Sequence, residues 1–343
     1  MSELYSRYVQ LCEETGKLAG ISFELTNYCN FSCKHCYRVH GNTFLEPEYF
    51  YKALSEAEAL GAIMIGFNGG EPTLHPNFLE FASAVLKRGM HLSVLTNGSG
   101  LNDEVLDALQ TWRKGVYFQY SLYGVDNRTG ANITGVPEAF ETAFSSVLDL
   151  QRHGFDLRVA LLVISETADG LPELVARLRD MDIRTGLNPQ LSVLENGDKV
   201  PLQLSATDDQ IIRVLPFEGN WATEPNEPTA VLDGVNHRTV ACSAGETSFG
   251  LRADGSIVPC QVFTAPVLGH ISTDSLDSVL HGEARAQFLA TNVIPDKCRA
   301  CDLFSNCMRC PADAMFETGE LAGIPQESCR IARLRAKMHV DSK

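Results

Sequence analysis

The sequence predicts an α/β fold in which six strand–helix units form a parallel sheet, followed by a small cysteine-rich C-terminal region. Apolar runs rich in β-formers alternate with amphipathic stretches of helical period over residues 21–215. The connections between them are short, which is typical of parallel α/β folds. Seven of the eleven cysteines lie further on, between positions 242 and 329.

The expected elements alternate regularly along the chain. A short helix is expected within residues 1–20. The strands cover residues 21–26, 63–68, 92–96, 116–122, 157–164 and 187–193. The helices cover residues 47–60, 77–88, 103–109, 137–153, 171–179 and 208–215. Pro137 is expected in the first turn of its helix, where a missing N–H costs little.

The number of units bounds the architecture. A full eight-fold barrel takes about 250 residues, whereas the alternation ends near residue 215. A partial (β/α)6 barrel fits this length, although periodicity alone does not separate a barrel from an open sheet. We therefore expect a core domain over residues 1–215, a linker over 216–237 and a second domain over 238–343 that ends in a helix. The linker loses periodicity and concentrates Pro, Gly, Asn and Glu.

Charge and composition exclude several classes of protein. The net charge of −15 argues against a nucleic-acid partner bound by phosphate neutralisation. No secretory signal and no apolar run of about 18 residues is visible, so we expect a cytoplasmic protein without a membrane partner. Thiols stay reduced in the cytoplasm, so the cysteines indicate metal binding rather than disulfides.

Cys29, Cys33 and Cys36 form a C-x3-C-x2-C loop directly after the first expected strand. Three thiolates on one loop can hold three corners of a four-iron cluster and leave the fourth iron open. Structural zinc prefers four protein ligands, and His35 lies between the last two cysteines.

Polar motifs close the next three strands. Gly69-Gly70-Glu71-Pro72 ends the second strand. Its glycines allow close backbone approach to a ligand, and Glu71 offers a carboxylate to an ammonium group; a simple Gly–Pro turn is the alternative. Asn97 and Ser121 follow on the third and fourth strands. Arg128 either binds a carboxylate through its fork or is a solvated loop arginine.

The C-terminal cysteines are spaced as C-x12-G-x4-C, then C-x2-C-x5-C-x2-C, then a last cysteine. They are Cys242, Cys260, Cys298, Cys301, Cys307, Cys310 and Cys329. A zinc ribbon separates its cysteine pairs by about 15–20 residues, whereas five residues intervene here. Two iron–sulfur clusters fit the seven ligands better, with one cluster a ligand short. Arg330, Arg333 and Arg335, beyond the last cysteine, are expected on a solvated helix face.

These motifs resemble those of the radical S-adenosylmethionine (SAM) superfamily with a C-terminal SPASM extension. The resemblance implies a partial TIM-like barrel with a small iron–sulfur domain. It implies SAM bound to the open iron of the cluster on Cys29, Cys33 and Cys36. His35 would contact the adenine, the motif Gly69, Gly70, Glu71 and Pro72 the methionine amino group, and Ser121 the ribose. Asn97 would also lie at the cofactor, and Arg128 at the SAM carboxylate.

The resemblance also implies two auxiliary [4Fe–4S] clusters, three in all. Cys242, Cys260 and Cys310 would hold the first, and the second would take Cys298, Cys301, Cys307 and Cys329. The family spaces the last internal pair by three residues, whereas two separate Cys307 from Cys310. The fourth ligand of the first auxiliary cluster stays open. Cys12 is expected to be a buried free thiol, with hydrogen-atom donation as a minor alternative.

The implied reaction is reductive cleavage of SAM to a 5′-deoxyadenosyl radical, which abstracts a hydrogen atom from a substrate. A peptide or protein substrate is favoured, modified by crosslinking, epimerisation or oxidation. The alternatives are a small-molecule dehydrogenase or decarboxylase and a non-catalytic iron–sulfur electron carrier. A flavodoxin- or ferredoxin-type reductant is expected. Residues 1–20 are too few for a leader-binding domain, so a separate leader-peptide-binding protein is a possible partner.

Overall fold

The computed structural model describes residues 3–218 and 242–341. Its centre is one sheet of nine strands in the order β6-β5-β4-β3-β2-β1-β7-β8-β9. The six strands expected from the sequence are all parallel neighbours. They are β1 (Gly20–Thr26), β2 (Met64–Gly69), β3 (His91–Thr96), β4 (Val116–Leu122), β5 (Asp156–Leu162) and β6 (Arg184–Asn188).

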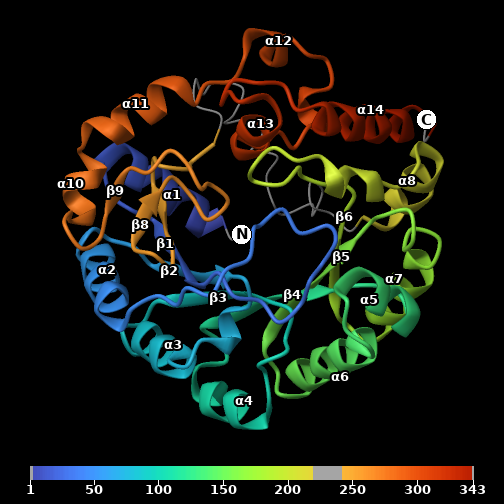
Figure 1. Cartoon of the computed structure of the whole chain (residues 1–343), viewed down its shortest axis with the longest axis horizontal. Helices are drawn as coiled ribbons and strands as arrows, with labels where there is room; N and C mark the ends of the chain where they lie inside the picture. Colours follow the sequence, from blue (N-terminus) through green and yellow to red (C-terminus); the bar gives the residue numbers. More distant parts are fainter. Residues whose placement is uncertain (1–2, 219–241, 342–343) are drawn as a thin grey trace.

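The crossover helices lie outside these strands, which curve around the centre of the molecule (Figure 1). This is the partial α/β barrel expected from the count of units. The helices are α2 (Pro47–Ala59), α3 (Phe78–Lys87), α4 (Asp103–Leu109), α6 (Ala139–Arg152), α7 (Leu171–Asp180) and α8 (Asp208–Val214), with α1 (Glu3–Thr15) preceding the barrel. Among the described helices, none is long and apolar enough to cross a membrane.

Two local expectations were wrong, and one helix was not predicted. The sixth strand ends at Asn188 instead of continuing to residue 193, because Pro189 has no N–H for the ladder. Leu191 and Val193 are buried in the loop that follows, which imitates a strand pattern. Pro137 precedes α6, which begins at Ala139 after Glu138 with a left-handed backbone. A helix that the sequence did not reveal, α5 (Asn127–Thr134), begins with a capping box at Asp126 and Thr129.

The cysteine-rich region extends the barrel sheet. β7 (Ser248–Leu251) pairs in parallel with β1, and β8 (Ser256–Val258) and β9 (Gly269–His270) continue the sheet antiparallel. Phe249 and Ile257 belong to the same buried cluster as Phe23 and Phe67 of the barrel. The two cysteine-bearing regions therefore lie on one continuous core. Most of the expected linker over 216–237 lies outside the described residues.

The remaining helices cover the upper part of the molecule in Figure 1. They are α10 (Leu276–Leu280), α11 (Glu283–Thr291), α12 (Asp296–Arg299), α13 (Pro311–Thr318) and α14 (Gln326–Asp341). Arg330 and Arg335 of α14 are not solvated as expected. Arg330 Nε lies 2.8 Å from Asp208 Oδ1 of α8, and Arg335 Nη2 lies 2.6 Å from Glu218 Oε1. These ion pairs hold the last helix against the end of the barrel.

Candidate active site

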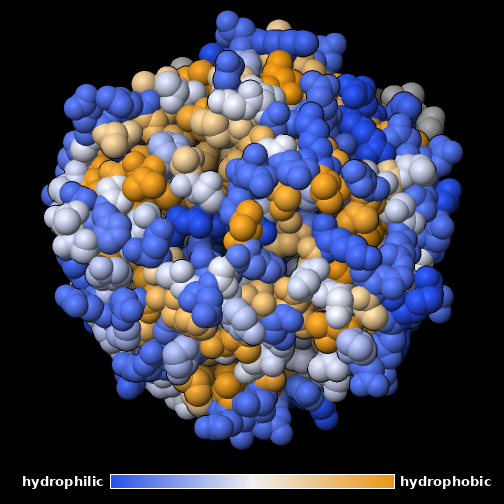
Figure 2. All heavy atoms as spheres, viewed as in Figure 1, coloured by the Kyte–Doolittle hydropathy of each residue, from blue (hydrophilic) through white to orange (hydrophobic). Residues whose placement is uncertain are grey.

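A cavity of about 180 Å³ lies where β1–β4 end, at the carboxyl edge of the barrel. The loop between β1 and α2 crosses this face, which is turned to the viewer in Figure 1. The space-filling view in Figure 2 shows hollows near its centre, bordered by both hydrophilic and hydrophobic side chains. Eight expected site residues line the cavity: Cys29, Cys33, Cys36, Gly69, Gly70, Glu71, Asn97 and Ser121.

The cysteine loop is fixed by backbone hydrogen bonds to α5. Ser32 N donates to Thr134 O at 2.9 Å, and Lys34 N donates to Ile133 O at 3.1 Å. Cys29 Sγ also accepts from its own loop, from the backbone N of Phe31 at 3.4 Å. The helix that the sequence did not reveal thus holds the three thiols in place around the cavity.

The three thiols share a partly buried environment. Burial raises the pKa of Cys29 to about 11 and raises the pKa values of Cys33 and Cys36. For Cys33, the neighbouring Cys36 and Cys29 raise the pKa further, because three thiolates repel one another. Within the described part of the chain, no group of three or more His, Cys, Asp or Glu side chains is arranged to hold a single metal ion.

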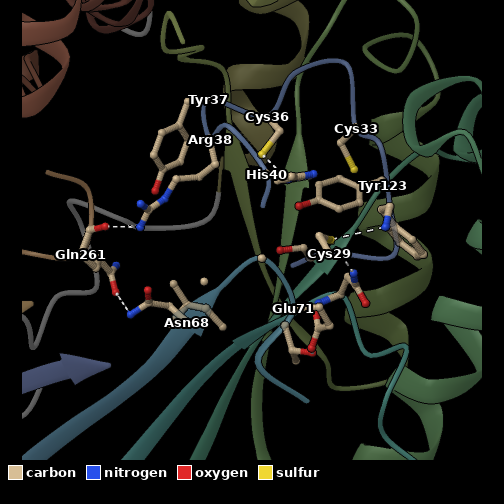
Figure 3. Close-up of a pocket in the computed structure, with 17 residues that line it drawn as sticks. Cys29, Cys33, Cys36, Tyr37, Arg38, His40, Asn68, Glu71, Tyr123 and Gln261 are labelled. Carbon is tan, nitrogen blue, oxygen red and sulfur yellow. Dashed lines mark hydrogen bonds between the residues drawn. The ribbon is translucent and has the colours of Figure 1, made fainter. Parts of the chain in front are cut away.

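Thiol chemistry at this cavity fits an iron–sulfur cluster. Iron ions bound to the sulfurs would compensate the mutual repulsion, and thiolate is the ligand that such clusters use. In Figure 3 the sulfurs of Cys29, Cys33 and Cys36 border one space, with Glu71 at its floor.

Glu71 is fully buried, and its carboxylate is held from three positions. Oε1 accepts from Thr73 Oγ1 at 2.6 Å and from Thr96 Oγ1 at 2.5 Å, and Oε2 accepts from Asn97 N at 2.7 Å. Burial raises the pKa of this carboxyl group. The carboxylate therefore ties the ends of β2 and β3 together, and Oε2 has a second lone pair beyond the one that Asn97 N uses.

Gly69 and Gly70, which precede Glu71, are required because their backbone packs closely on another backbone segment of the protein. Gly70 N donates to Thr26 O at 2.8 Å, and Glu71 N donates to Tyr28 O at 2.8 Å. A Cβ at Gly70 would lie 2.0 Å from Tyr28 O, and Gly69 has a φ of 135°. The turn thus rests on the segment that leads into the cysteine loop, a reason that the sequence alone did not supply.

Three expected site residues do not line the cavity. His35 is half-buried with its ring centroid 4.7 Å from that of Tyr123, and desolvation of the ring lowers its pKa to about 4. Pro72 begins a short 3-10 helix, Pro72–Leu74. The side chain of Arg128 is 71% exposed on α5, with Nη1 3.7 Å from Glu166 Oε1. This position corresponds to the solvated alternative for Arg128.

Residues that the sequence analysis did not single out complete the lining. They are Phe31, Tyr37, Arg38, His40, Asn68, Leu95, Thr96, Tyr123 and Gln261. Asn68 Nδ2 donates to Gln261 Oε1 at 3.0 Å across the cavity wall (Figure 3). Several of them flank the quoted motifs: Arg38 follows Cys36 by two residues, Asn68 precedes Gly69, and Gln261 follows Cys260. Their position next to these motifs in the sequence was the signal that could have identified them.

All eleven cysteines of the chain are free of disulfides, and the C-terminal cysteines raise one another's pKa values in two sets. Burial raises the pKa of Cys260 to about 11, and Cys242 raises it further. Burial raises the pKa of Cys310 to about 12, and Asp313 and Cys260 raise it further. Burial also raises the pKa of Cys307 to about 11. The neighbouring Cys329, Cys298 and Cys301 raise it further. Cys12 lies apart, buried on α1.

Fold and site together define a partial α/β barrel with a thiol-lined cavity at its carboxyl edge and a cysteine-rich extension of its sheet. The family model of the radical SAM superfamily matches residues 23–178. The SPASM iron–sulfur cluster-binding domain matches residues 242–311. A cofactor-modifying protein for tungsten-containing aldehyde ferredoxin oxidoreductase from Pyrococcus furiosus is 31% identical over 315 residues, covering 83% of this chain and 87% of its own. The chain belongs to the radical SAM superfamily, whose members bind SAM and an iron–sulfur cluster.

Other relatives carry names from peptide biosynthesis. The antilisterial bacteriocin subtilosin biosynthesis protein AlbA of Bacillus subtilis is 25% identical and covers 81% of this chain. The chain spans 64% of the length of AlbA. A PqqA peptide cyclase of Ruegeria pomeroyi is 26% identical, covering 85% of this chain and 82% of its own. The crystal structure of Streptococcus suis SuiB bound to precursor peptide SuiA superposes with a TM-score of 0.69 at 15% identity, covering 95% of this chain and 80% of SuiB. That likeness shows the shared fold.

Proposed function

We propose that this chain is a radical SAM enzyme that abstracts a hydrogen atom from a peptide or protein substrate. The observation that carries the proposal is the convergence of three thiols, the glycine turn and Glu71 on one cavity at the barrel mouth. A cluster on Cys29, Cys33 and Cys36 supplies reductive cleavage of SAM to a 5′-deoxyadenosyl radical. The resulting modification would be a crosslink, an epimerisation or an oxidation.

The chain's own residues would orient SAM. Gly69, Gly70 and Glu71 line the cavity, and the second lone pair of Glu71 Oε2 is the proposed acceptor for the ammonium group of SAM. Asn97 Nδ2 lies 3.7 Å from Cys29 Sγ, so its amide is placed beside a cluster ligand. Ser121, on the β4 wall, is the candidate for the ribose hydroxyls. His35 and Pro72 would act from behind the cavity lining, by packing on Tyr123 and by starting the turn after Glu71. Arg128 is not proposed as a ligand for SAM, because its exposed side chain lies beside Glu166.

Two auxiliary [4Fe–4S] clusters are proposed for the C-terminal region. The electrostatic neighbourhoods described above support Cys242, Cys260 and Cys310 as one ligand group and Cys298, Cys301, Cys307 and Cys329 as the other. We propose a core domain over residues 1–215, a linker over 216–237 and the auxiliary domain over 238–343. A flavodoxin- or ferredoxin-type protein would supply electrons, and a separate leader-peptide-binding protein remains a proposed partner. The proposed location is the cytoplasm.

A peptide substrate is favoured by the relatives and by the cavity wall. The names of the PqqA peptide cyclase and of the SuiB–SuiA complex refer to peptides. The bond between Asn68 and Gln261 uses one donor and one acceptor. The side-chain carbonyl of Asn68 and the side-chain amide N–H groups of Gln261 take no part in this bond. They form an acceptor–donor pair that matches the N–H and C=O of a peptide group.

Modification of a small molecule is the second candidate. It is favoured by the Pyrococcus furiosus relative, whose name refers to cofactor modification. The two candidates differ in the pool from which the hydrogen atom comes.

Isotope transfer tests the proposal. Extract from the native host grown in deuterated medium would be split into peptide and small-molecule fractions. Each would be incubated anaerobically with reconstituted enzyme, unlabelled SAM and dithionite. We expect deuterium in 5′-deoxyadenosine with the peptide fraction. Label from the small-molecule fraction alone would replace the peptide proposal with the second candidate. Absence of 5′-deoxyadenosine in every reaction would contradict both and revive the electron carrier.

A further inference from the structure

Arg38 joins the two cysteine-bearing regions at the cavity. It follows Cys36 by two residues, and its Nη2 donates to the backbone carbonyl of Gln261, which follows Cys260. Figure 3 shows the guanidinium reaching from the cysteine loop to Gln261, with the Tyr37 ring beside it. One side chain thus connects a proposed ligand loop of the SAM-binding cluster to that of the first auxiliary cluster.

The guanidinium is buried and held in one position. The Arg38 side chain is 10% exposed, and Nη1 lies 3.3 Å from Glu24 Oε2 and 3.8 Å from Glu195 Oε2. Glu195 is fixed in turn, because its Oε1 accepts from Val39 N at 3.0 Å and its N donates to Tyr37 O at 2.9 Å. Arginine stays charged under all ordinary conditions. A fixed positive charge therefore lies between the two cysteine loops, in a medium that screens it weakly.

Both loops lie next to this charge, because Arg38 is two residues from Cys36 and its Nη2 donates to the carbonyl of Gln261, the residue after Cys260. Reduction of a cluster adds one negative charge, which the same cation stabilises. Net charge and hydrogen bonding around a cluster are established determinants of its reduction potential.

We propose that Arg38 is a positioning residue that holds the Cys36 and Cys260 loops together and raises the reduction potentials of both adjoining clusters. The inference rests on the cluster assignment proposed above. Removing the guanidinium would also leave Glu195 without this cation and Glu24 with Arg252 alone, which lowers both potentials further. Arg252 lies 3.8 Å from the same Glu24 oxygen and donates to Phe263 O at 3.5 Å instead of to Gln261. It offers a matched control.

The test is an anaerobic potentiometric titration of the reconstituted holoenzyme, followed by electron paramagnetic resonance. Arg38→Gln is expected to lower the reduction equilibrium constant of the SAM-binding cluster and of one auxiliary cluster at least tenfold each, which is about 59 mV for a one-electron couple. Arg38→Lys keeps the charge and should stay closer to the wild type at both clusters. Arg252→Gln should shift both by less than Arg38→Gln.

If the Arg38→Gln variant does not incorporate its clusters on reconstitution, Glu24→Gln provides a second test by the same titration. This nearly isosteric change removes one opposing carboxylate, so both potentials should rise. Unchanged potentials in Arg38→Gln, or in Glu24→Gln where the former does not load, would overturn the inference. So would a shift at one cluster alone. A wild-type protein whose only cluster signal disappears in the Cys29, Cys33 and Cys36 alanine variant would instead contradict the proposed auxiliary clusters.

Discussion

Gly70 illustrates how much of the site is decided at single residues. Its backbone packs so tightly on Tyr28 that no side chain fits between them. The sequence indicated a close approach at this turn, and the structure shows that the approaching group is the segment before Cys29. Glu71 was likewise identified from its motif, whereas its hydrogen bonds from Thr96 and Asn97 depend on how β2 and β3 are aligned. Sequence motifs name such residues, but their partners come from the assembled sheet.

Gly70→Ala is expected to displace the cysteine loop. Forcing a methyl group into packed structure costs about 1–3 kcal/mol, and here the obstacle is backbone rather than a movable side chain. Formation of 5′-deoxyadenosine should fall at least tenfold, measured by chromatography with dithionite and SAM. Gly115→Ala is the control, since its Cβ would meet the Leu86 side chain at 3.3 Å without a positive φ. Equal activity of the two variants would refute this account of the turn.

Ionisation of the buried thiols gives a pH dependence with a definite sign. Burial raises the pKa of Cys29 to about 11, compared with about 8.5 in an unfolded chain. The folded, cluster-free chain therefore keeps this contribution to stability below about pH 8.5 and loses it as the pH rises toward 11. The urea midpoint of the cluster-free protein should fall between pH 7.5 and pH 10. It should fall less in Cys29→Ser, whose hydroxyl does not titrate there; a larger fall in that variant would contradict the assignment.

At the scale of elements, the strong apolar periods predicted the parallel strands well. α5 was missed because its helical signal is a polar capping box inside a loop-like segment. β6 was misplaced because loop residues 191 and 193 are buried like strand residues. The role of α14 was also misjudged. In the sequence its arginines resemble a solvated helix face, because their partners Asp208 and Glu218 are brought next to them only by the fold.

Arg335→Ala is expected to loosen α14. The Arg335 side chain is 14% exposed and that of Glu218 is 11% exposed, and the two form two hydrogen bonds. Leaving Glu218 without its partner should lower the free energy of unfolding by about 3 kcal/mol. Urea unfolding followed by circular dichroism would measure the loss. Arg333→Ala, at an exposed position of the same helix, should change it by less than about 0.5 kcal/mol. Similar losses in both variants would show that the ion pair is not the cause.

At the scale of the whole molecule, one sheet carries both cysteine regions. The sequence predicted the barrel units and a cysteine-rich second part, but the pairing of β7 with β1 joins positions more than two hundred residues apart. No local pattern indicates such a pairing, because it depends on which edge of the barrel sheet is left open. The result places Gln261, the residue after Cys260, in the lining of the cavity of Cys29, Cys33 and Cys36. This arrangement underlies the proposal that Arg38 holds the Cys36 and Cys260 loops together.

The central claim is that one cluster at the barrel mouth cleaves SAM while two others occupy the C-terminal region. The most direct measurement combines iron content with 5′-deoxyadenosine formation in the Cys29, Cys33 and Cys36 to Ala triple variant, after reconstitution. The account predicts no 5′-deoxyadenosine and about two-thirds of the wild-type iron, because two of three clusters persist. Retained SAM cleavage would contradict the assignment of the mouth cluster. Loss of nearly all iron would contradict the auxiliary clusters.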